Sequence, residues 1–206
     1  MLSHRRLQQD FRQLINNPLQ NIRAYPDSEN ILLWHFILFG DGVYEGGQYY
    51  GQIIYPEDYP HSPPDMKMLT PSGRFEPNKK ICMTMTSFHK KQWSPTWTAS
   101  SLLLGLQSFF YDESPGSIGS IHSSDEERRA FARESVAFNS GNKTISRIIQ
   151  DHFSDLVKRS ADEQKMRKRK VEYDTDGAQS SMKRNKNHET NSDKPVQGIE
   201  VIEILD

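Results

Sequence analysis

Prolines are concentrated in one stretch of the chain, and this stretch limits what the rest can fold into. Between residues 56 and 77 the prolines are Pro56, Pro60, Pro63, Pro64, Pro71 and Pro77. Proline has no backbone N–H and a fixed φ, so it interrupts helices and is kept out of central strands. We therefore predict a rigid, extended loop here, with one short strand at residues 66–69.

The segment before the prolines is typical of a helix followed by strands. Leu7, Phe11, Leu14 and Ile15 recur at helical spacing, Ser3 is the expected cap, and Asn-Asn-Pro at residues 16–18 ends the pattern. Runs rich in aromatic and β-branched residues follow at residues 22–24, 31–39 and 48–55, separated by glycine-containing turns. These features predict a helix and then an antiparallel meander.

The segment after the prolines is predicted to be helical. Thr98 is the expected cap of an apolar helix that runs to Phe110. Ser123 or Ser124, with Glu126 or Glu127, forms a capping box for a helix to about Phe138, and a third helix is expected at residues 143–157. The chain thus has a helix, an antiparallel meander, a long loop and further helices. This order is typical of an α+β domain.

The composition changes near residue 158. Beyond it the only aromatic residue is Tyr173, and charged and polar residues dominate. Such a segment does not bury enough apolar surface to offset its ordering entropy. We therefore predict a folded domain over residues 1–157 and a charged, disordered tail over residues 158–206. The N-terminus has no apolar signal segment, and no run is long enough to span a membrane.

The chain has one cysteine, Cys82, so no internal disulfide and no multi-cysteine metal site is expected. A lone cysteine is most often a small buried apolar residue. The neighbouring Lys79 and Lys80 instead favour a reactive thiolate, and His89 lies close enough in sequence to pair with it. Because no Asn or Asp is placed as a third member, a papain-like protease is not predicted.

Several motifs around Cys82 together resemble the core of ubiquitin-conjugating enzymes. In order they are Tyr59-Pro60-His61-Ser62-Pro63-Pro64, Ile81-Cys82, Trp93-Ser94-Pro95 and the helix at residues 102–110. The resemblance implies the ubiquitin-conjugating fold, with an N-terminal helix, a four-stranded antiparallel meander, an active-site loop and C-terminal helices. It also implies an acyltransferase in which Cys82 accepts ubiquitin as a thioester from the activating enzyme. No cofactor is expected, because the activating enzyme uses the ATP.

The chain departs from most of that family, which carries His-Pro-Asn shortly before the cysteine. Here the sequence is Thr70-Pro71-Ser72-Gly73-Arg74-Phe75. In this it resembles the divergent branch that acts in endoplasmic-reticulum-associated protein degradation and modifies hydroxyl side chains as well as lysines. That branch usually has a C-terminal membrane anchor. None is visible in this sequence, so attachment to the endoplasmic reticulum would come through a partner.

The resemblance also implies supporting catalytic residues. Ser72 stands where the branch usually has an Asn, and Asn78 is the nearest side-chain amide, so both are candidate oxyanion donors. The alternative for Asn78 is a turn residue. Asp112 and Glu113 are candidates for an acidic residue at the channel rim, or are simply exposed turn acids. His89 is a candidate acid or base for transfer to hydroxyl groups, and its alternative role is a surface or capping residue.

Two surfaces are predicted to bind partners. A RING-type ligase would contact loops that hold His61, Pro63, Pro64, Ser94, Pro95 and Trp97. The activating enzyme would contact Arg5, Arg6 and Arg12 on the first helix, whose alternative role is a solvated polar face. Trp34 and Trp93 are expected to be core or bracing residues.

The tail carries two further patterns. Basic runs at residues 165–170 and 183–186 resemble a nuclear-import signal, or are a solvated charge run. Apolar residues interleaved with acids between Ile199 and Leu205 resemble a SUMO-interacting motif, with a strand folded back on the domain as the alternative. We expect a cytoplasmic protein, at the endoplasmic-reticulum surface or in the nucleus. The net charge of −1 predicts no nucleic-acid partner.

A different class of function remains open at this point. An inactive scaffold of the same fold would bind ubiquitin or a ligase without carrying a thioester. Such variants typically lose the cysteine, and Cys82 is present, so the sequence favours the enzyme. A nuclear adaptor that acts through the tail is compatible with either.

Overall fold

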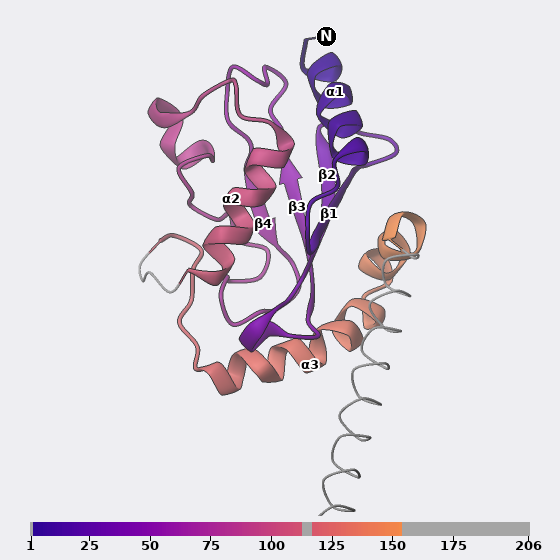
Figure 1. Ribbon diagram of the computed structural model, residues 1–206, viewed down its shortest axis with the longest axis vertical. Coiled ribbons are helices and arrows are strands. Elements are labelled where there is room, and N and C mark those ends of the chain that lie inside the picture. The colour runs from indigo at the N-terminus through magenta and orange to yellow at the C-terminus, as the bar shows by residue number, and fades with distance from the viewer. Residues whose placement is uncertain (1, 113–116, 154–206) are drawn as a thin grey trace, which may run out of the picture. The chain divides into compact units, whose positions relative to one another are not determined.

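The computed structural model describes residues 2–112 and 117–153 of the chain. The N-terminal helix α1 (Leu2–Asn16) is followed by the strands β1 (Ile22–Pro26), β2 (Leu33–Phe39), β3 (Gln48–Ile54) and β4 (Asp65–Met68). Short 3₁₀ helices, η1 (Gly42–Tyr44) and η2 (Ser87–Gln92), lie in the connections. The helices α2 (Ala99–Tyr111) and α3 (Asp125–Gly141) come next, and residues 143–153 are again helical. The predicted α+β order is confirmed (Figure 1).

Within the described residues the sheet has four strands in the order β1-β2-β3-β4, and each neighbouring pair is antiparallel. This is the predicted meander. The strand at residues 65–68 starts one residue after Pro64, because proline restricts the residues that can join the ladder. Every strand end agrees with its prediction to within two residues.

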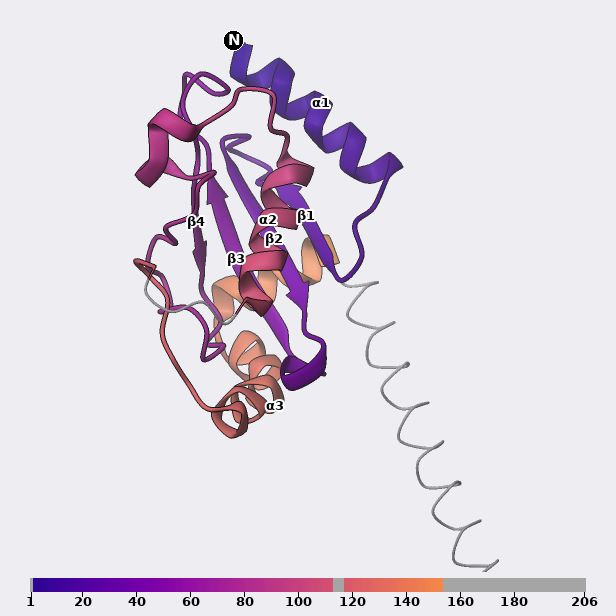
Figure 2. The ribbon, with the colours of Figure 1, turned by 60° about the vertical axis from the view of Figure 1, so that its left-hand side comes forward.

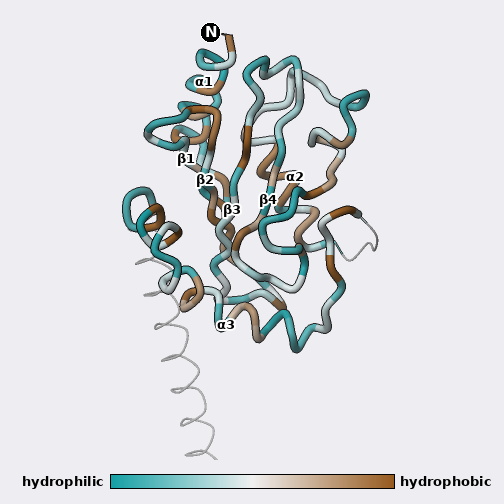
Figure 3. Tube along the Cα trace, turned by 180° about the vertical axis from the view of Figure 1, so that it is seen from behind, coloured by the Kyte–Doolittle hydropathy of each residue, from teal (hydrophilic) through white to brown (hydrophobic). Residues whose placement is uncertain are grey.

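The central strand β2 is buried on both faces of the sheet. Trp34, Phe36 and Leu38 pack in the main core, together with apolar residues of α1 and α2. Ile37 belongs to a second cluster, on the opposite face, with Tyr50 of β3 and with Ile145, Ile149 and Phe153 of the last helix. Figure 2 shows α2 on one side of the sheet and residues 143–153 on the other, and Figure 3 shows the apolar strands between them. Burial on both faces explains the continuous apolar run of β2.

The helix caps follow the local sequence, with one exception. Thr98 caps α2 in a capping box with Ser101, and Ser124 forms the predicted capping box with Glu127 at the start of α3. Hydrogen bonds from Ser124 lower the pKa of the Glu127 carboxyl. The prediction for Ser3 is wrong: Ser3 is buried inside α1, which already begins at Leu2. α3 also extends three residues beyond the expected end, to Gly141.

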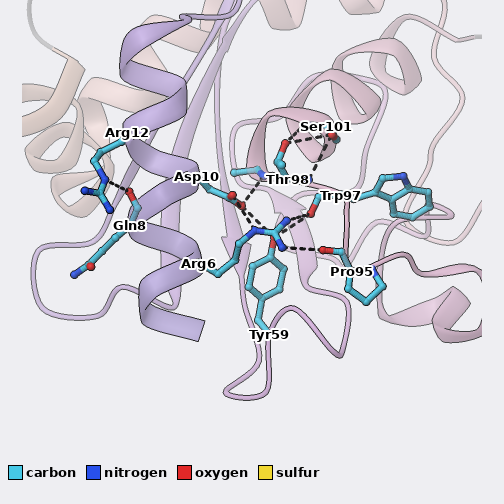
Figure 4. Close-up of polar contacts among 10 residues, drawn as sticks. Arg6, Gln8, Asp10, Arg12, Tyr59, Pro95, Trp97, Thr98 and Ser101 are labelled. Atoms are coloured by element: carbon cyan, nitrogen blue, oxygen red, sulfur yellow. Dashed lines mark hydrogen bonds and ion pairs between the residues drawn. The ribbon is translucent and has the colours of Figure 1, made fainter. Parts of the chain in front are cut away.

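A buried carboxylate joins the first helix to the start of α2. Asp10 is 1% exposed. One of its oxygens accepts a hydrogen bond from Arg6 Nε at 3.0 Å, and the other accepts from the Ala99 backbone N–H at 3.0 Å and the Tyr59 hydroxyl at 3.3 Å. Figure 4 shows these groups converging on Asp10. A negative charge at a helix N-terminus is favourable, and here it replaces water for several donors.

Arg6 extends this junction to the loop that precedes α2. Its Nη1 donates to the Pro95 carbonyl at 2.8 Å and its Nη2 donates to the Trp97 carbonyl at 2.6 Å (Figure 4). The guanidinium also lies over the Tyr59 ring. Helix α1, the loop at residues 95–97 and the start of α2 are therefore held as one unit.

The opposite face of the sheet contains a polar group of its own. His35, on β2, is 2% exposed, and its ring nitrogens lie 2.7 Å from the Tyr50 hydroxyl and 3.0 Å from Asp27 Oδ2. The hydrogen bond with His35 lowers the pKa of Asp27, and burial raises the pKa of Tyr50 to about 12. The buried His35 and Tyr50 are thus hydrogen-bonded to each other, and the partly exposed Asp27 satisfies the second ring nitrogen of His35.

We predict that Asp10→Ala lowers the free energy of unfolding by about 3 kcal/mol, because it leaves Arg6 and the Ala99 N–H without their buried acceptor. Urea denaturation followed by tryptophan fluorescence measures this difference. Gln9→Ala, on the exposed side of the same helix, is the matched control and should change stability little. Equal effects of the two substitutions would contradict the role given to Asp10.

We also predict a pH-dependent effect of Asp27→Asn. Because the folded-state pKa of Asp27 lies below its ordinary value of 3.8, its ionised form stabilises the fold above that pH. That contribution is lost as the pH falls through the folded-state pKa. The variant should melt below wild type at about pH 6, and the two melting temperatures should converge in acid. A difference that stays constant with pH, or one matched by the exposed neighbour Glu29→Gln, would refute this.

Candidate active site around Cys82

Cys82 is held in place from both sides by backbone hydrogen bonds. On one side Ile81 N–H donates to the Met66 carbonyl of the edge strand β4, at 2.8 Å. On the other side Cys82 N–H donates to the Ile118 carbonyl at 2.9 Å. Gly119 allows this second approach: it has a φ of +86°, and a Cβ there would lie 2.6 Å from the Lys80 carbonyl oxygen. The cysteine is half-buried, which leaves the thiol in a fixed position with access to solvent.

The turn after the cysteine is organised by Thr86, a residue that the sequence analysis missed. Its buried hydroxyl accepts from Met83 N–H at 3.0 Å and faces the carbonyls of Ile81 at 3.2 Å and Met83 at 2.8 Å. A buried threonine whose hydroxyl closes a turn fixes the backbone on either side of it. The only sequence signal was the position of Thr86 in a short polar loop, which does not distinguish it from neighbouring threonines.

The structure brings His89 to Cys82, a pairing that the sequence analysis left open. Sγ and His89 Nε2 are 3.2 Å apart. His89 lies in η2, where its backbone leaves the helical region at φ −123° and ψ 49°, and its N–H donates to the Thr86 carbonyl at 3.0 Å. In the described part of the chain no side chain hydrogen-bonds to the second ring nitrogen. Within the described residues the pair thus has no side chain that orients the histidine ring, as the third member of a protease triad would.

The two candidate oxyanion donors have local structural roles. The Ser72 oxygen accepts from the N–H groups of Arg74 at 3.2 Å and Phe75 at 3.4 Å, and the residue is fully buried. Asn78 has a left-handed φ of 63°, and its side-chain oxygen accepts from Lys67 Nζ at 2.8 Å. These contacts favour the turn interpretation of Asn78. Neither side chain hydrogen-bonds to Cys82, so their catalytic roles stay predictions.

The acidic candidates lie after α2. Asp112 is exposed and is the C-cap of that helix, its N–H donating to the Ser108 carbonyl at 3.1 Å. Its charge acts on Arg74, whose pKa is lowered by burial and raised in part by Tyr44 and Asp112. Glu113 lies outside the described residues, as does the entire tail, with the basic runs at residues 165–170 and 183–186 and the segment from Ile199 to Leu205. The predicted boundary between residues 157 and 158 lies outside them too.

The predicted ligase surface is only partly exposed. His61 and Pro95 are exposed, and Ser94 and Trp97 are half-buried. Pro63 and Pro64 are buried, so other parts of these loops supply the exposed surface, and ligase binding there stays a prediction. Trp93 braces the loop, as expected, because its indole N–H donates to the Pro60 carbonyl at 2.8 Å.

The three arginines predicted to contact the activating enzyme do not all lie free on the surface of α1. Arg5 and Arg12 are exposed on α1, in agreement with either role considered for them. Arg6 is different, because all three of its guanidinium nitrogens hydrogen-bond within the domain. The structure gives Arg6 an internal bracing role that its place on a polar helix face did not indicate.

In residues 2–112 and 117–153, no three His, Cys, Asp or Glu side chains are grouped as metal ligands. No helix in the same ranges is long and apolar enough to cross a membrane.

Comparisons with known proteins agree with this geometry. A model of the ubiquitin-conjugating enzyme family matches residues 6–138. The chain is 44% identical over 146 residues to Ubiquitin-conjugating enzyme E2 J2-like from Dictyostelium discoideum, covering 70% of this chain and 85% of that protein. It is 42% identical over 139 residues to Ubiquitin-conjugating enzyme E2 6 from Schizosaccharomyces pombe, covering 66% of this chain and 61% of that protein.

The human relative Ubiquitin-conjugating enzyme E2 J2 is 39% identical over 148 residues, which is 71% of this chain and 57% of that protein. The chain therefore spans less than two thirds of the yeast and human relatives and most of the Dictyostelium one. The family model covers the first helix, the meander, the cysteine loop and the helices α2 and α3 up to Phe138. The chain belongs to the ubiquitin-conjugating enzyme family.

Proposed function

We propose that Cys82 carries ubiquitin as a thioester. Its thiolate attacks the thioester that joins ubiquitin to the activating enzyme. A new bond forms between Cys82 Sγ and the ubiquitin carboxyl carbon, and the activating enzyme leaves as its own thiolate. The exchange has little net energetic cost, since one thioester replaces another. The observation that supports this most strongly is a half-buried thiol, held on both sides by backbone hydrogen bonds, with His89 Nε2 3.2 Å from its sulfur.

In the second step we propose transfer to a lysine of the substrate, and also to serine or threonine. The acceptor nitrogen or oxygen attacks the thioester carbonyl, the C–S bond breaks, and Cys82 leaves as a thiolate. The acceptor loses a proton, which His89 Nε2 takes and can return to the sulfur. Because a hydroxyl is barely ionised at neutral pH, it depends on such a base more than an amine does.

The partners follow from the same proposal. They are ubiquitin, the activating enzyme that spends ATP, and a RING-type ligase docked at the exposed parts of the loops at residues 61–62 and 94–97. The sequence resemblance to the branch of endoplasmic-reticulum-associated degradation supports a role in protein quality control. It also supports a location in the cytoplasm at the surface of that organelle. The basic runs of the tail support a nuclear location as the second candidate, and the segment from Ile199 to Leu205 a SUMO-like partner.

We predict that the protein forms a thiol-sensitive adduct when it is mixed with activating enzyme, ubiquitin and ATP. Non-reducing gels should show the adduct with wild type, and Cys82→Ser should lack the thiol-sensitive band. If the activating enzyme is charged and the wild-type protein is not, the proposal fails. The alternative function, a scaffold that binds ubiquitin or a ligase without a thioester, would then be the better explanation.

We predict that His89→Ala slows discharge of the charged enzyme onto free serine by about 100-fold, the lower range for loss of a general base. Discharge onto free lysine should slow less, because the amine needs less help to lose its proton. Single-turnover chase of the charged enzyme measures both rates. Lys90→Ala, next to His89 on the same 3₁₀ helix, is the matched control. Unchanged rates onto both acceptors in His89→Ala would exclude His89 as the base.

A further inference from the structure

One carboxylate connects the chain before Cys82 to the chain after it. Asp65 is the first residue of β4, and its side chain is 17% exposed. Its Oδ2 accepts from Lys80 Nζ at 2.6 Å, and its Oδ1 accepts from the Ser87 hydroxyl. Lys80 lies two residues before the cysteine, and Ser87 lies two residues before His89. Each oxygen of Asp65 thus holds one end of the loop that carries the pair.

Backbone carbonyls on either side of Asp65 also accept hydrogen bonds from the two ends of this loop. The Pro64 carbonyl accepts from Ser87 N–H at 3.1 Å, and the Met66 carbonyl accepts from Ile81 N–H at 2.8 Å. Both ends of the loop are therefore hydrogen-bonded to the start of β4. Asp65 adds a charged contact at each end, in a setting where charge-assisted hydrogen bonds are stronger than neutral ones.

We propose that Asp65 is a positioning residue that keeps His89 against Cys82. Ser87 begins η2, so the contact between Ser87 and Asp65 sets where that short helix starts and hence where His89 lies. The contact between Lys80 and Asp65 fixes the position of the strand-like segment that ends at Cys82. This inference deepens the proposed function, because it rests on Cys82 and His89 acting together.

If Asp65 acted only through its charge, its removal would change the reactivity of Cys82 in the opposite direction from a loss of positioning. The charged side chains on the segments around the pair are Glu76, Lys79, Lys80, Lys90 and Lys91, with Asp65 itself and Lys67 on β4. Removing a negative charge from this neighbourhood favours the thiolate, so it would raise the reactivity of Cys82. Loss of positioning separates His89 from the thiol and lowers that reactivity. The sign of the change therefore distinguishes the two roles.

The test is the rate of alkylation of Cys82 by iodoacetamide, measured on the full chain over a range of pH. Since Cys82 is the single cysteine, the modification reports on one site and needs no ubiquitin. We expect Asp65→Ala to slow alkylation near neutral pH about threefold or more, and to shift the pH profile toward that of His89→Ala. Ser87→Ala, which removes one of the two contacts, should change the rate in the same direction.

The matched control is Glu76→Ala. Glu76 pairs with Lys79 at 2.6 Å in the same loop, both side chains are half-exposed, and neither contacts the segment after Cys82. Its removal should leave the alkylation profile unchanged. Melting temperatures of all variants identify any that fail to fold, and Ser87→Ala then decides in place of Asp65→Ala.

The decisive comparison is made in the His89→Ala background. If Asp65 acts through His89, Asp65→Ala should add no further change there. A slowing as large in that background as in wild type, a faster alkylation, or an equal effect of Glu76→Ala would overturn the proposal. Alkylation does not require the thioester with ubiquitin. A protein that fails to accept ubiquitin but shows the expected alkylation rates in both backgrounds would therefore refute the proposed function and leave the role of Asp65 intact.

Discussion

The site depends on how the edge strand β4 satisfies its backbone. An edge strand presents unpaired N–H and C=O groups, which folded proteins cover or pair. Here Met68 and Met66 offer carbonyls that accept from Asn78 N–H at 2.7 Å and Ile81 N–H at 2.8 Å. The chain therefore runs beside β4 just before Cys82. The cysteine leaves this pairing at the point where the segment at residues 117–121 takes over as the hydrogen-bond partner.

Buried polar side chains then set the geometry that apolar packing leaves open. Thr86 closes the turn after the cysteine, and Asp10 joins α1 to the start of α2. Each is fully or almost fully buried and is surrounded by donors or acceptors. Hydrophobic burial is nondirectional, so it gathers the helices on the sheet without fixing loop angles. Hydrogen bonds in a low-dielectric interior supply that direction, since leaving one unmade is costly.

The surface proposed to bind a ligase also combines buried and exposed residues. Pro63 and Pro64 make the loop rigid and are covered, while His61 and Pro95 are left outside. Arg6 holds the Pro95 and Trp97 carbonyls and so supports the loop from within. A ligase docked on this face would thus meet a preorganised loop and lose little ordering entropy on binding.

Local sequence determined the elements of this protein. Helical spacing in α1, the caps Thr98 and Ser124, and the apolar run of β2 were all predicted from neighbouring residues, because a cap or a periodic face depends on positions three or four residues apart. The motifs around Cys82 also identified the family, and the spacing of Cys82 and His89 allowed them to pair. This pairing was accessible because both residues lie in one short loop.

Tertiary structure alone decided which polar residues are internal. Arg6 and Pro95 are 89 residues apart in sequence, and Asp65 and Ser87 are 22 apart, so no local pattern connects them. Ser3 was mistaken for a cap, and the burial of Pro63 and Pro64 was not predicted, because burial depends on what packs against a residue from elsewhere in the chain. A sequence lists the groups that can bond, and only the folded backbone determines which of them come within 3 Å of one another.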